Sequence, residues 1–113
     1  MRSGLTVRQK SLLIQARFRH NGEHIGQGFT ATKKIGNAVK RNRAKRRLRA
    51  AAHQLLPDYG LNGVDYVFIA RQSILQVSWD RLLDDMKKAL ISLSRLLKES
   101  QQNAWSRAEP DTL

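Results

Sequence analysis

The segment Lys40–Arg49 holds the side chains of this 113-residue chain that are best suited to chemistry with another molecule. Seven of its ten residues are Lys or Arg, and none is acidic. On a helix, like charges three or four residues apart repel by about 0.2–0.5 kcal/mol per pair, and cations in the first turn oppose the helix dipole. Both effects become favourable when phosphates bind there. A charge run usually marks only a solvated surface, but a run of a single sign favours phosphate binding.

Other side chains that could carry catalysis or bind a metal are scattered. His20 and His24 are four residues apart, but no cysteine and no nearby pair of acids completes a metal site. His53 follows the basic segment, where a solvated histidine is the simpler interpretation. The aspartates Asp80, Asp84 and Asp85 fit helix capping and pairing with the nearby lysines. We therefore expect no catalytic residue, no metal and no cofactor bound by the protein alone.

Composition limits the class of protein. The net charge is +12, from 21 Lys and Arg against 9 Asp and Glu, and nine of the cations lie between Lys33 and Arg49. Such a basic chain predicts a polyanionic partner, either nucleic acid or an anionic membrane surface. The chain has no cysteine, no signal-peptide pattern and no apolar run of about 18 residues. These features predict a single cytoplasmic domain without a membrane span.

Period-two patterns predict three strands. Residues Ser11–His20 alternate apolar and polar side chains, and Asn21–Gly22 is a turn signal. A second strand is expected in Ile25–Lys34, so that the two strands would form an antiparallel hairpin. The nearly continuous apolar run in Val64–Arg71 predicts a third strand at a central position.

Two helices are expected between and after these strands. Asn37 is a good N-cap for a helix that runs to about Leu56, where Pro57 and the following glycines would end it. Ser78 can cap a second helix over Trp79–Glu99, which carries leucines at spacings of three and four. Residues 1–99 would form one domain. The polar segment 100–113 is expected to be a disordered tail.

The first helix has a narrow apolar side, which we call the keel. Placed at 100° per residue, five apolar side chains fall in one stripe, wide enough to dock on a sheet. They are Ala44, Leu48, Ala51, Ala52 and Leu55. The rest of the helix circumference is basic, and Arg predominates over Lys, which suits bidentate contact with phosphate.

The stretch GFTATKKIGNAVKRNRAKRRLR strongly resembles the signature region of the bacterial ribonuclease P protein component. The later DYVFIAR and the amphipathic last helix also fit, so the resemblance covers roughly Lys10–Leu97. It implies an α+β fold: a two-layer α/β sandwich with a small, mostly antiparallel sheet. The basic helix would lie in a left-handed crossover, against the usual rule, and an amphipathic helix would follow near the C-terminus.

The resemblance also implies a function. Members of the family bind a catalytic RNA, and the holoenzyme removes the 5′ leader from precursor tRNA. The RNA carries the active site and uses Mg²⁺. The expected partners are therefore ribonuclease P RNA and precursor tRNA, with one protein bound to each RNA and no membrane. The expected RNA-binding residues are Lys33, Lys34, Lys40, Arg41, Asn42, Arg43, Lys45, Arg46, Arg47 and Arg49. The polar face of the first two strands, with Gln15, Arg17, Thr30 and Thr32, is the candidate leader groove.

The chain departs from the family pattern in two places. The family normally has an N-terminal helix whose aromatic residues face the leader, whereas only about ten residues precede the first predicted strand here. That helix is therefore expected to be missing. Gln15 also stands where relatives often have a stacking tyrosine. The alternative function is that of a non-catalytic ribosomal or other structural RNA-binding protein. A basic-region DNA binder is less favoured, because Pro57 interrupts the helix where a dimerising zipper should continue.

Overall fold

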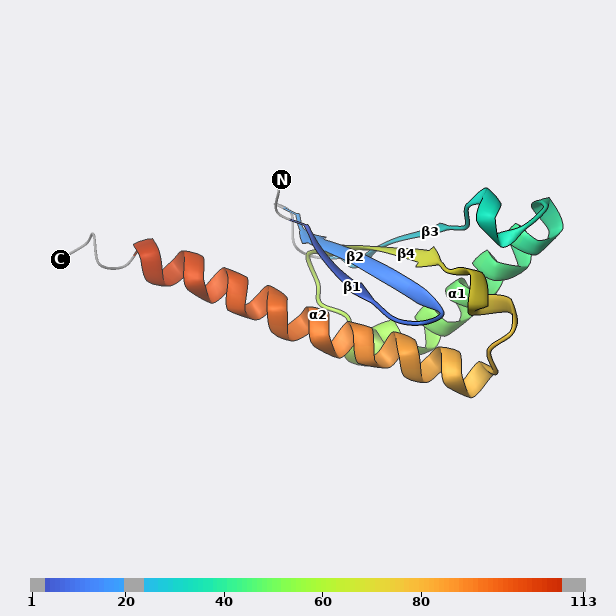
Figure 1. Cartoon of the computed structure of the whole chain (residues 1–113). Helices are drawn as coiled ribbons and strands as arrows, with labels where there is room; N and C mark the ends of the chain where they lie inside the picture. Colours follow the sequence, from blue (N-terminus) through green and yellow to red (C-terminus); the bar gives the residue numbers. More distant parts are fainter. Residues whose placement is uncertain (1–3, 20–23, 109–113) are drawn as a thin grey trace.

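Four strands form one sheet, and two long helices cover one of its faces (Figure 1). The computed structural model describes residues 4–19 and 24–108, with side chains up to residue 100. In chain order the elements are β1 (Leu5–Arg8), β2 (Leu12–Phe18), β3 (Gly26–Thr30), the 3₁₀ helix η1 (Lys33–Ile35), α1 (Ala38–Tyr59), β4 (Val64–Ala70), the 3₁₀ helix η2 (Gln72–Leu75) and α2 (Trp79–Ala108). This is the two-layer α/β sandwich that the sequence predicts.

Alternation along the strands gives the sheet one buried face and one open face. In β4 every second residue from Val64 to Ala70 is buried, and β2 repeats the pattern from Leu12 to Ala16. Because successive side chains point to opposite faces, the residues between them lie on the open side. The buried face packs against the keel of α1 and the apolar stripe of α2. The sheet and the helices therefore share one core.

The order of the strands is β1-β2-β4-β3. β2 pairs antiparallel with β1 and with β4, whereas β3 pairs parallel with β4 at the edge of the sheet. The predicted hairpin of residues 11–20 with residues 25–34 is therefore wrong, and its turn at Asn21–Gly22 lies outside the described residues. β4 separates the two strands because it is the most apolar of them, and an inner position buries it best. The central position predicted for Val64–Arg71 is confirmed.

The first strand, β1, was not predicted from the sequence. Leu5 and Val7 pack against the core, and Thr6 and Arg8 lie on the open side. Four residues with two apolar positions are too short a period-two signal to identify a strand without its partner. The segment is identified as a strand by its antiparallel pairing with β2, which places Leu5 opposite Ala16.

The basic helix α1 begins where the sequence predicts. Asn37 has an extended backbone, and its side-chain Oδ1 accepts a hydrogen bond from the backbone N–H of Lys40 at 3.0 Å. All five keel residues are buried. The helix continues through Pro57 to Tyr59 instead of ending near Leu56. A proline in the last turn removes one backbone donor, which a helix tolerates when it ends immediately afterwards.

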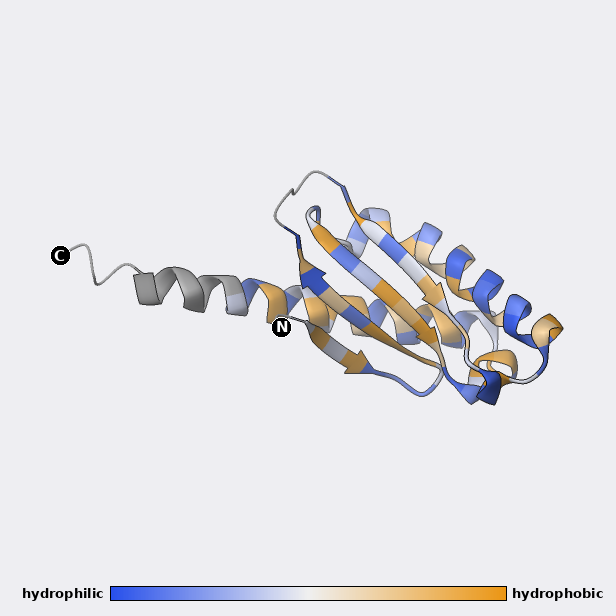
Figure 2. Ribbon diagram, turned by 90° about the horizontal axis from the view of Figure 1, so that it is seen from above, coloured by the Kyte–Doolittle hydropathy of each residue, from blue (hydrophilic) through white to orange (hydrophobic). Residues whose placement is uncertain are grey.

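The connection from β3 through α1 to β4 links two neighbouring parallel strands. Figure 2, with the open face toward the viewer, shows α1 behind the sheet and emerging beyond the edge formed by β3. When Figure 2 is turned so that β3 and β4 point upward, the chain leaves β3, passes behind the sheet as α1, and returns as β4 on the right of β3. The crossover is therefore left-handed, as the family resemblance implies and against the common rule. It leaves the outer side of α1 uncovered along the β3 edge.

The second helix, α2, packs its apolar stripe into the same core. Ser78 caps it, since its Oγ accepts the backbone N–H of Arg81 at 3.1 Å. The predicted pairing of Asp84 is confirmed by an ion pair with Lys88 at 3.0 Å. Asp85 has a different role: the residue is 2 % exposed, and its carboxylate accepts hydrogen bonds from Ser11 Oγ at 2.7 Å and Arg81 Nε at 3.1 Å. This buried carboxylate ties α2 to the start of β2.

The helix α2 extends past Glu99 to Ala108. The backbone of residues 100–108 is therefore helical, although the sequence predicts a disordered tail there, and residues 109–113 lie outside the described residues. Once a helix is docked, each further residue adds one hydrogen bond, and the segment contains no Gly or Pro before Pro110. The long helix gives the molecule its elongated shape, with extents of 59 × 24 × 24 Å (Figure 1).

Candidate nucleic-acid interface

The basic segment starts at a tight junction between η1 and α1. Gly36 has a φ of 139°, which residues with a side chain rarely adopt, and its carbonyl accepts a hydrogen bond from Arg41 Nη1 at 2.9 Å. The junction places Lys33 and Lys34 of η1 next to the beginning of α1. The first turn of α1 contains no acidic residue. No carboxylate in that turn competes with an external anion for the positive end of the helix.

Two cations of α1 are used inside the protein. Arg41 holds the Gly36 carbonyl, as described above. Arg47 donates from Nη1 to the Ile74 carbonyl at 2.6 Å and from Nη2 to the Val77 carbonyl at 2.8 Å. These carbonyls belong to η2 and the loop before α2, so Arg47 fixes α1 against the segment that leads into α2. Sequence analysis could place Arg47 only among the RNA-binding residues, because its partners are backbone groups 27 and 30 residues further along the chain.

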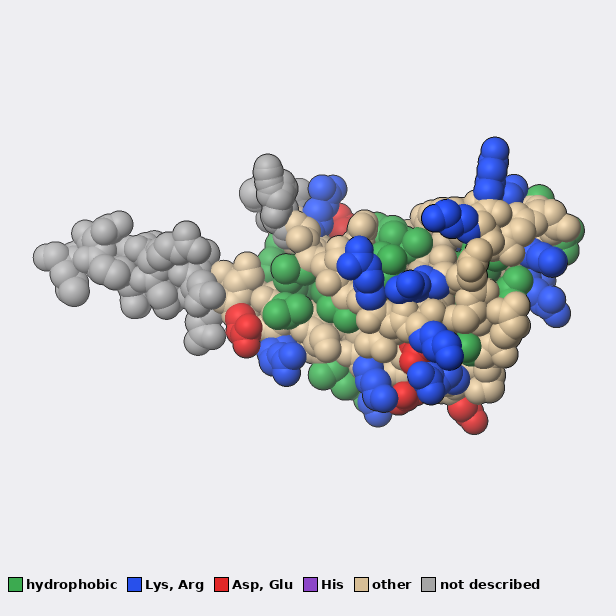
Figure 3. Space-filling model, viewed as in Figure 1, with side chains coloured by type: hydrophobic (Ala, Val, Ile, Leu, Met, Phe, Trp, Pro, Cys, Tyr) green, Lys and Arg blue, Asp and Glu red, His purple; other side chains and the backbone are tan. Residues whose placement is uncertain are grey.

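The other cations of the segment have no hydrogen bond or ion pair to the described part of the protein. They are Lys33, Lys34, Lys40, Arg43, Lys45, Arg46 and Arg49. Asn42, between Arg41 and Arg43, is likewise exposed. On the face seen in Figure 3, Lys and Arg side chains gather at the right-hand end, over η1 and the start of α1. Apart from Arg41 and Arg47, the predicted RNA-binding cations therefore keep their hydrogen-bond donors unused within the described residues.

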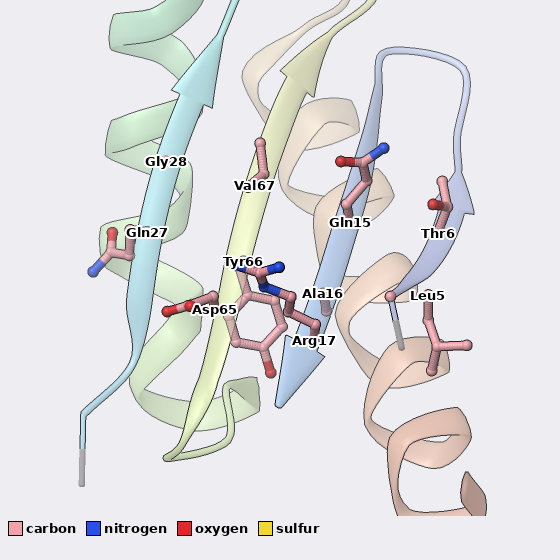
Figure 4. A pocket seen from close by; sticks show the side chains of 11 residues that line it. Leu5, Thr6, Gln15, Ala16, Arg17, Gln27, Gly28, Asp65, Tyr66 and Val67 are labelled. Atoms are coloured by element: carbon pink, nitrogen blue, oxygen red, sulfur yellow. The ribbon is translucent and has the colours of Figure 1, made fainter. Parts of the chain in front are cut away.

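The open face of the sheet has a hollow of about 560 Å³ that spans all four strands (Figure 4). Gln15 and Arg17 of β2 line it, next to Thr6 of β1 and Val67 of β4. At one end Asp65 forms an ion pair with Arg19 at 3.2 Å. Two of the predicted leader-groove residues therefore lie side by side in one depression. Thr30 lies at the exposed end of β3, outside this hollow.

A second hollow of about 780 Å³ lies at the other end of the open face, next to η1. Its apolar lining includes Leu13 and Ile69, and Thr32 also lines it. Five cations surround it: Arg8, Lys10, Lys33, Lys34 and Arg71. Hydrogen bonds hold its rim together, because Ser73 Oγ donates to the Lys10 carbonyl at 2.8 Å and Gln72 Nε2 donates to the Lys34 carbonyl at 3.4 Å.

Sequence analysis missed three cations of this second hollow: Arg8, Lys10 and Arg71. Each stands alone in the sequence at the end of a strand or in a turn, so no local charge run marks it. They converge because β1 and β2 meet at a short turn that lies beside the end of β4. Outside Lys33–Arg49 the net charge of the chain is only +3, so composition gives no signal for this second basic site.

No group of three or more His, Cys, Asp or Glu side chains in residues 4–19 and 24–108 could hold a metal ion. The buried hydroxyl of Tyr66 accepts the backbone N–H of Leu61 at 3.0 Å, and burial raises the pKa of Tyr66 above its ordinary value, so it stays protonated.

Neither helix of the described chain combines the length and apolar character needed to span a bilayer.

Together, the fold and this surface define a small, basic, two-layer α/β domain of the polyanion-binding type. Comparison with known proteins specifies the family, because the ribonuclease P family model matches residues 1–107. A ribonuclease P protein component from Caulobacter vibrioides is 55 % identical over 85 residues, covering 74 % of this chain and 57 % of the relative. The corresponding protein of Ruegeria pomeroyi is 55 % identical over 86 residues, covering 74 % of this chain and 69 % of the relative. The chain therefore belongs to the bacterial ribonuclease P protein family.

Solved structures of the family share the fold. The ribonuclease P protein of Staphylococcus aureus superposes with a TM-score of 0.65 at 25 % identity, covering 77 % of this chain and 78 % of that protein. The protein of Thermotoga maritima gives a TM-score of 0.69 at 19 % identity, covering 79 % of this chain and 83 % of that protein. The match to the Caulobacter relative spans 57 % of that relative's length.

We expect Arg47→Ala to lower the free energy of unfolding by about 1–3 kcal/mol, because it removes two charged hydrogen bonds between α1 and the segment before α2. Arg43→Ala is the matched control: Arg43 lies on the same helix, is exposed, and its side chain makes no hydrogen bond or ion pair to the described residues. It should change stability by no more than about 0.5 kcal/mol. Urea unfolding followed by circular dichroism measures both values. Equal stability of the two variants would contradict the structural role of Arg47.

Proposed function

We propose that the chain is the protein subunit of ribonuclease P and assists the removal of the 5′ leader from precursor tRNA. In this proposal one copy binds one ribonuclease P RNA in the cytoplasm, and the RNA supplies the active site with its Mg²⁺. The observation that carries the proposal is the basic surface of α1, whose exposed cations have no hydrogen bond or ion pair within the described protein and lie in the stretch that resembles the family's signature region. The protein contributes binding and charge neutralisation, and no step of bond cleavage.

The exposed side of α1 is the surface we assign to the catalytic RNA. Arg43 and Arg46 are three residues apart and so lie on adjacent turns of one helix side. Their charges repel in the free protein, and RNA phosphates placed between them would replace repulsion by attraction. The first turn adds backbone N–H groups and the positive end of the helix dipole. Such a surface binds RNA backbone with little dependence on base sequence.

The open face of the sheet is the surface we assign to the single-stranded leader. Its two hollows differ in character: the one around Gln15 is lined by one cation, Arg17, and one acid, Asp65, whereas the one next to η1 has five cations around an apolar lining. An unpaired strand has both exposed bases and a charged backbone, so it suits a surface that offers apolar and cationic groups together. Because η1 connects directly to α1, the two RNA surfaces are continuous.

The proposal predicts that cleavage requires the RNA and is stimulated by the protein. Precursor tRNA is incubated with ribonuclease P RNA at low Mg²⁺ and moderate salt, with and without the chain. The protein should increase the cleavage rate, because it reduces the repulsion between two polyanions. The double variant Arg43→Ala/Arg46→Ala should lose most of the stimulation, and its affinity for the RNA should fall by roughly tenfold or more.

Two results would contradict the proposal. Cleavage by the protein in the absence of RNA would show that the protein, and not the RNA, contains the active site. Tight binding to ribonuclease P RNA without any stimulation would instead favour the alternative of a non-catalytic RNA-binding protein. The matched control is the double variant Arg95→Ala/Lys98→Ala on exposed positions of α2, which should stimulate cleavage as the wild type does.

The second hollow makes a separate prediction about the leader. In the holoenzyme, Arg8→Ala/Lys10→Ala should weaken the binding of precursor tRNA with a leader of several nucleotides by roughly three- to tenfold, because two cations near the backbone are lost. The affinity for mature tRNA, which has no leader, should stay at the wild-type value. Filter binding with the two RNAs measures both. A variant that binds precursor tRNA as tightly as the wild type would exclude this hollow from the leader path.

A further inference from the structure

Arg49 differs from the other exposed cations of α1 because its guanidinium lies over an aromatic ring. The guanidinium carbon is 5.4 Å from the centroid of Phe29 in β3, within the range of a cation–π interaction. Phe29 in turn stacks on Phe68 of β4, with centroids 5.3 Å apart and planes inclined by 14°. Phe68 stacks on Tyr66 at 6.2 Å. A column of three rings thus runs from the core to the edge of the sheet, and Arg49 covers its outer end.

This arrangement holds Arg49 in place without using its hydrogen-bond donors. The residue is exposed and makes no hydrogen bond or ion pair to the described part of the chain, in contrast to Arg41 and Arg47. A guanidinium is planar and weakly hydrated, and it can stack on one partner while a second flat group approaches from the other side. Phe29 is half-buried and fixed by Phe68, so the platform beneath Arg49 is rigid.

The surroundings of Arg49 suit a nucleotide. Lys45 and Arg46 lie four and three residues before it, on the adjacent turn, and can hold phosphates on either side of a base. By contrast, the described strand residues on the open face of the sheet include no aromatic ring. They are Thr6, Arg8, Leu13, Gln15, Arg17, Gly26, Gly28, Thr30, Asp65, Val67 and Ile69. A stacking partner for a base is therefore offered at the β3 edge, beside α1.

We propose that Arg49, seated on Phe29, is a stacking platform for one unpaired nucleobase of the RNA that binds along α1. This inference rests on the proposed function, which places RNA on that side of the helix. It assigns Arg49 a different task from Arg43 and Arg46, which contact phosphates. A base held at this position would fix the register of the RNA along the helix, which phosphate contacts alone leave free to slide.

The test replaces the guanidinium while keeping the charge. The full chain with Arg49→Lys is compared with wild type and with Arg95→Lys, a charge-preserving change at an exposed position of α2. Each is titrated into ribonuclease P RNA alone and, in the holoenzyme, into precursor tRNA over a series of salt concentrations. Arg49→Lys should bind the RNA that donates the base roughly three- to tenfold more weakly, because lysine lacks the planar group that stacks. The slope of log affinity against log salt should not change, because the number of cations is the same.

A second variant removes the lower half of the platform. Phe29→Leu should weaken RNA binding by a similar factor, and combining it with Arg49→Lys should produce no further loss, because both changes remove the same stack. Thermal melting checks that the leucine variant folds; if it does not fold, the Arg49→Lys titration decides alone.

The outcomes separate this inference from the proposed function. If wild-type protein does not bind ribonuclease P RNA, the proposed function fails. If wild type binds, and Arg49→Lys binds both RNAs within twofold of Arg95→Lys, only the platform is refuted. A weaker Arg49→Lys complex whose salt slope has also fallen would identify a phosphate contact, and would likewise overturn the platform. The RNA whose affinity falls, ribonuclease P RNA or precursor tRNA, identifies the source of the base.

Discussion

The keel of α1 must be buried before any cation on that helix can be held in a fixed position. It is narrow, with three alanines and two leucines, and all five residues are buried against the sheet and α2. Burying each leucine contributes about 1.5–3 kcal/mol, whereas each pair of like charges on the helix costs about 0.2–0.5 kcal/mol. The few large contacts therefore outweigh the many small repulsions, and the helix stays folded with its charges facing outward. The left-handed crossover then sets which side faces outward, because it leaves α1 uncovered along the edge of β3.

Given that docking, the structure divides the cations of one short segment into three groups. Arg41 and Arg47 hold backbone carbonyls and fix the helix at its start and against the segment before α2. Arg49 lies on a ring at the edge of the sheet. The others are exposed or, at Lys45, half-buried, and they lack hydrogen-bond and ion-pair partners in the described chain, so their repulsion is relieved when they meet a polyanion. Stability and the proposed RNA binding thus depend on neighbouring residues of one helix, and a substitution at Arg47 tests a different property from one at Arg43.

Local signals in the sequence were sufficient for the starts and the buried faces of the helices, but not for their ends or for the order of the strands. Asn37, Ser78 and the keel were identified correctly, because caps and helical periodicity depend on residues a few positions apart. The order of the strands depends on which strand gains most from an inner place, and a turn signal at Asn21–Gly22 does not contain that information. The role of Arg47 and the second hollow could not be predicted for the same reason: each depends on groups that only the folded chain brings together. The left-handed crossover was available only through the family resemblance.

In the proposed complex, the exposed cations of α1 neutralise RNA phosphates. The salt dependence of binding to ribonuclease P RNA tests it most directly, with wild type compared to the triple variant Arg43→Ala/Lys45→Ala/Arg46→Ala. Each phosphate contact that is lost should reduce the magnitude of the slope of log affinity against log salt by roughly 0.7–0.9, so the three substitutions together should reduce it by roughly two to three. An equal slope for the two proteins, or wild-type binding that does not weaken as salt rises, would contradict the account.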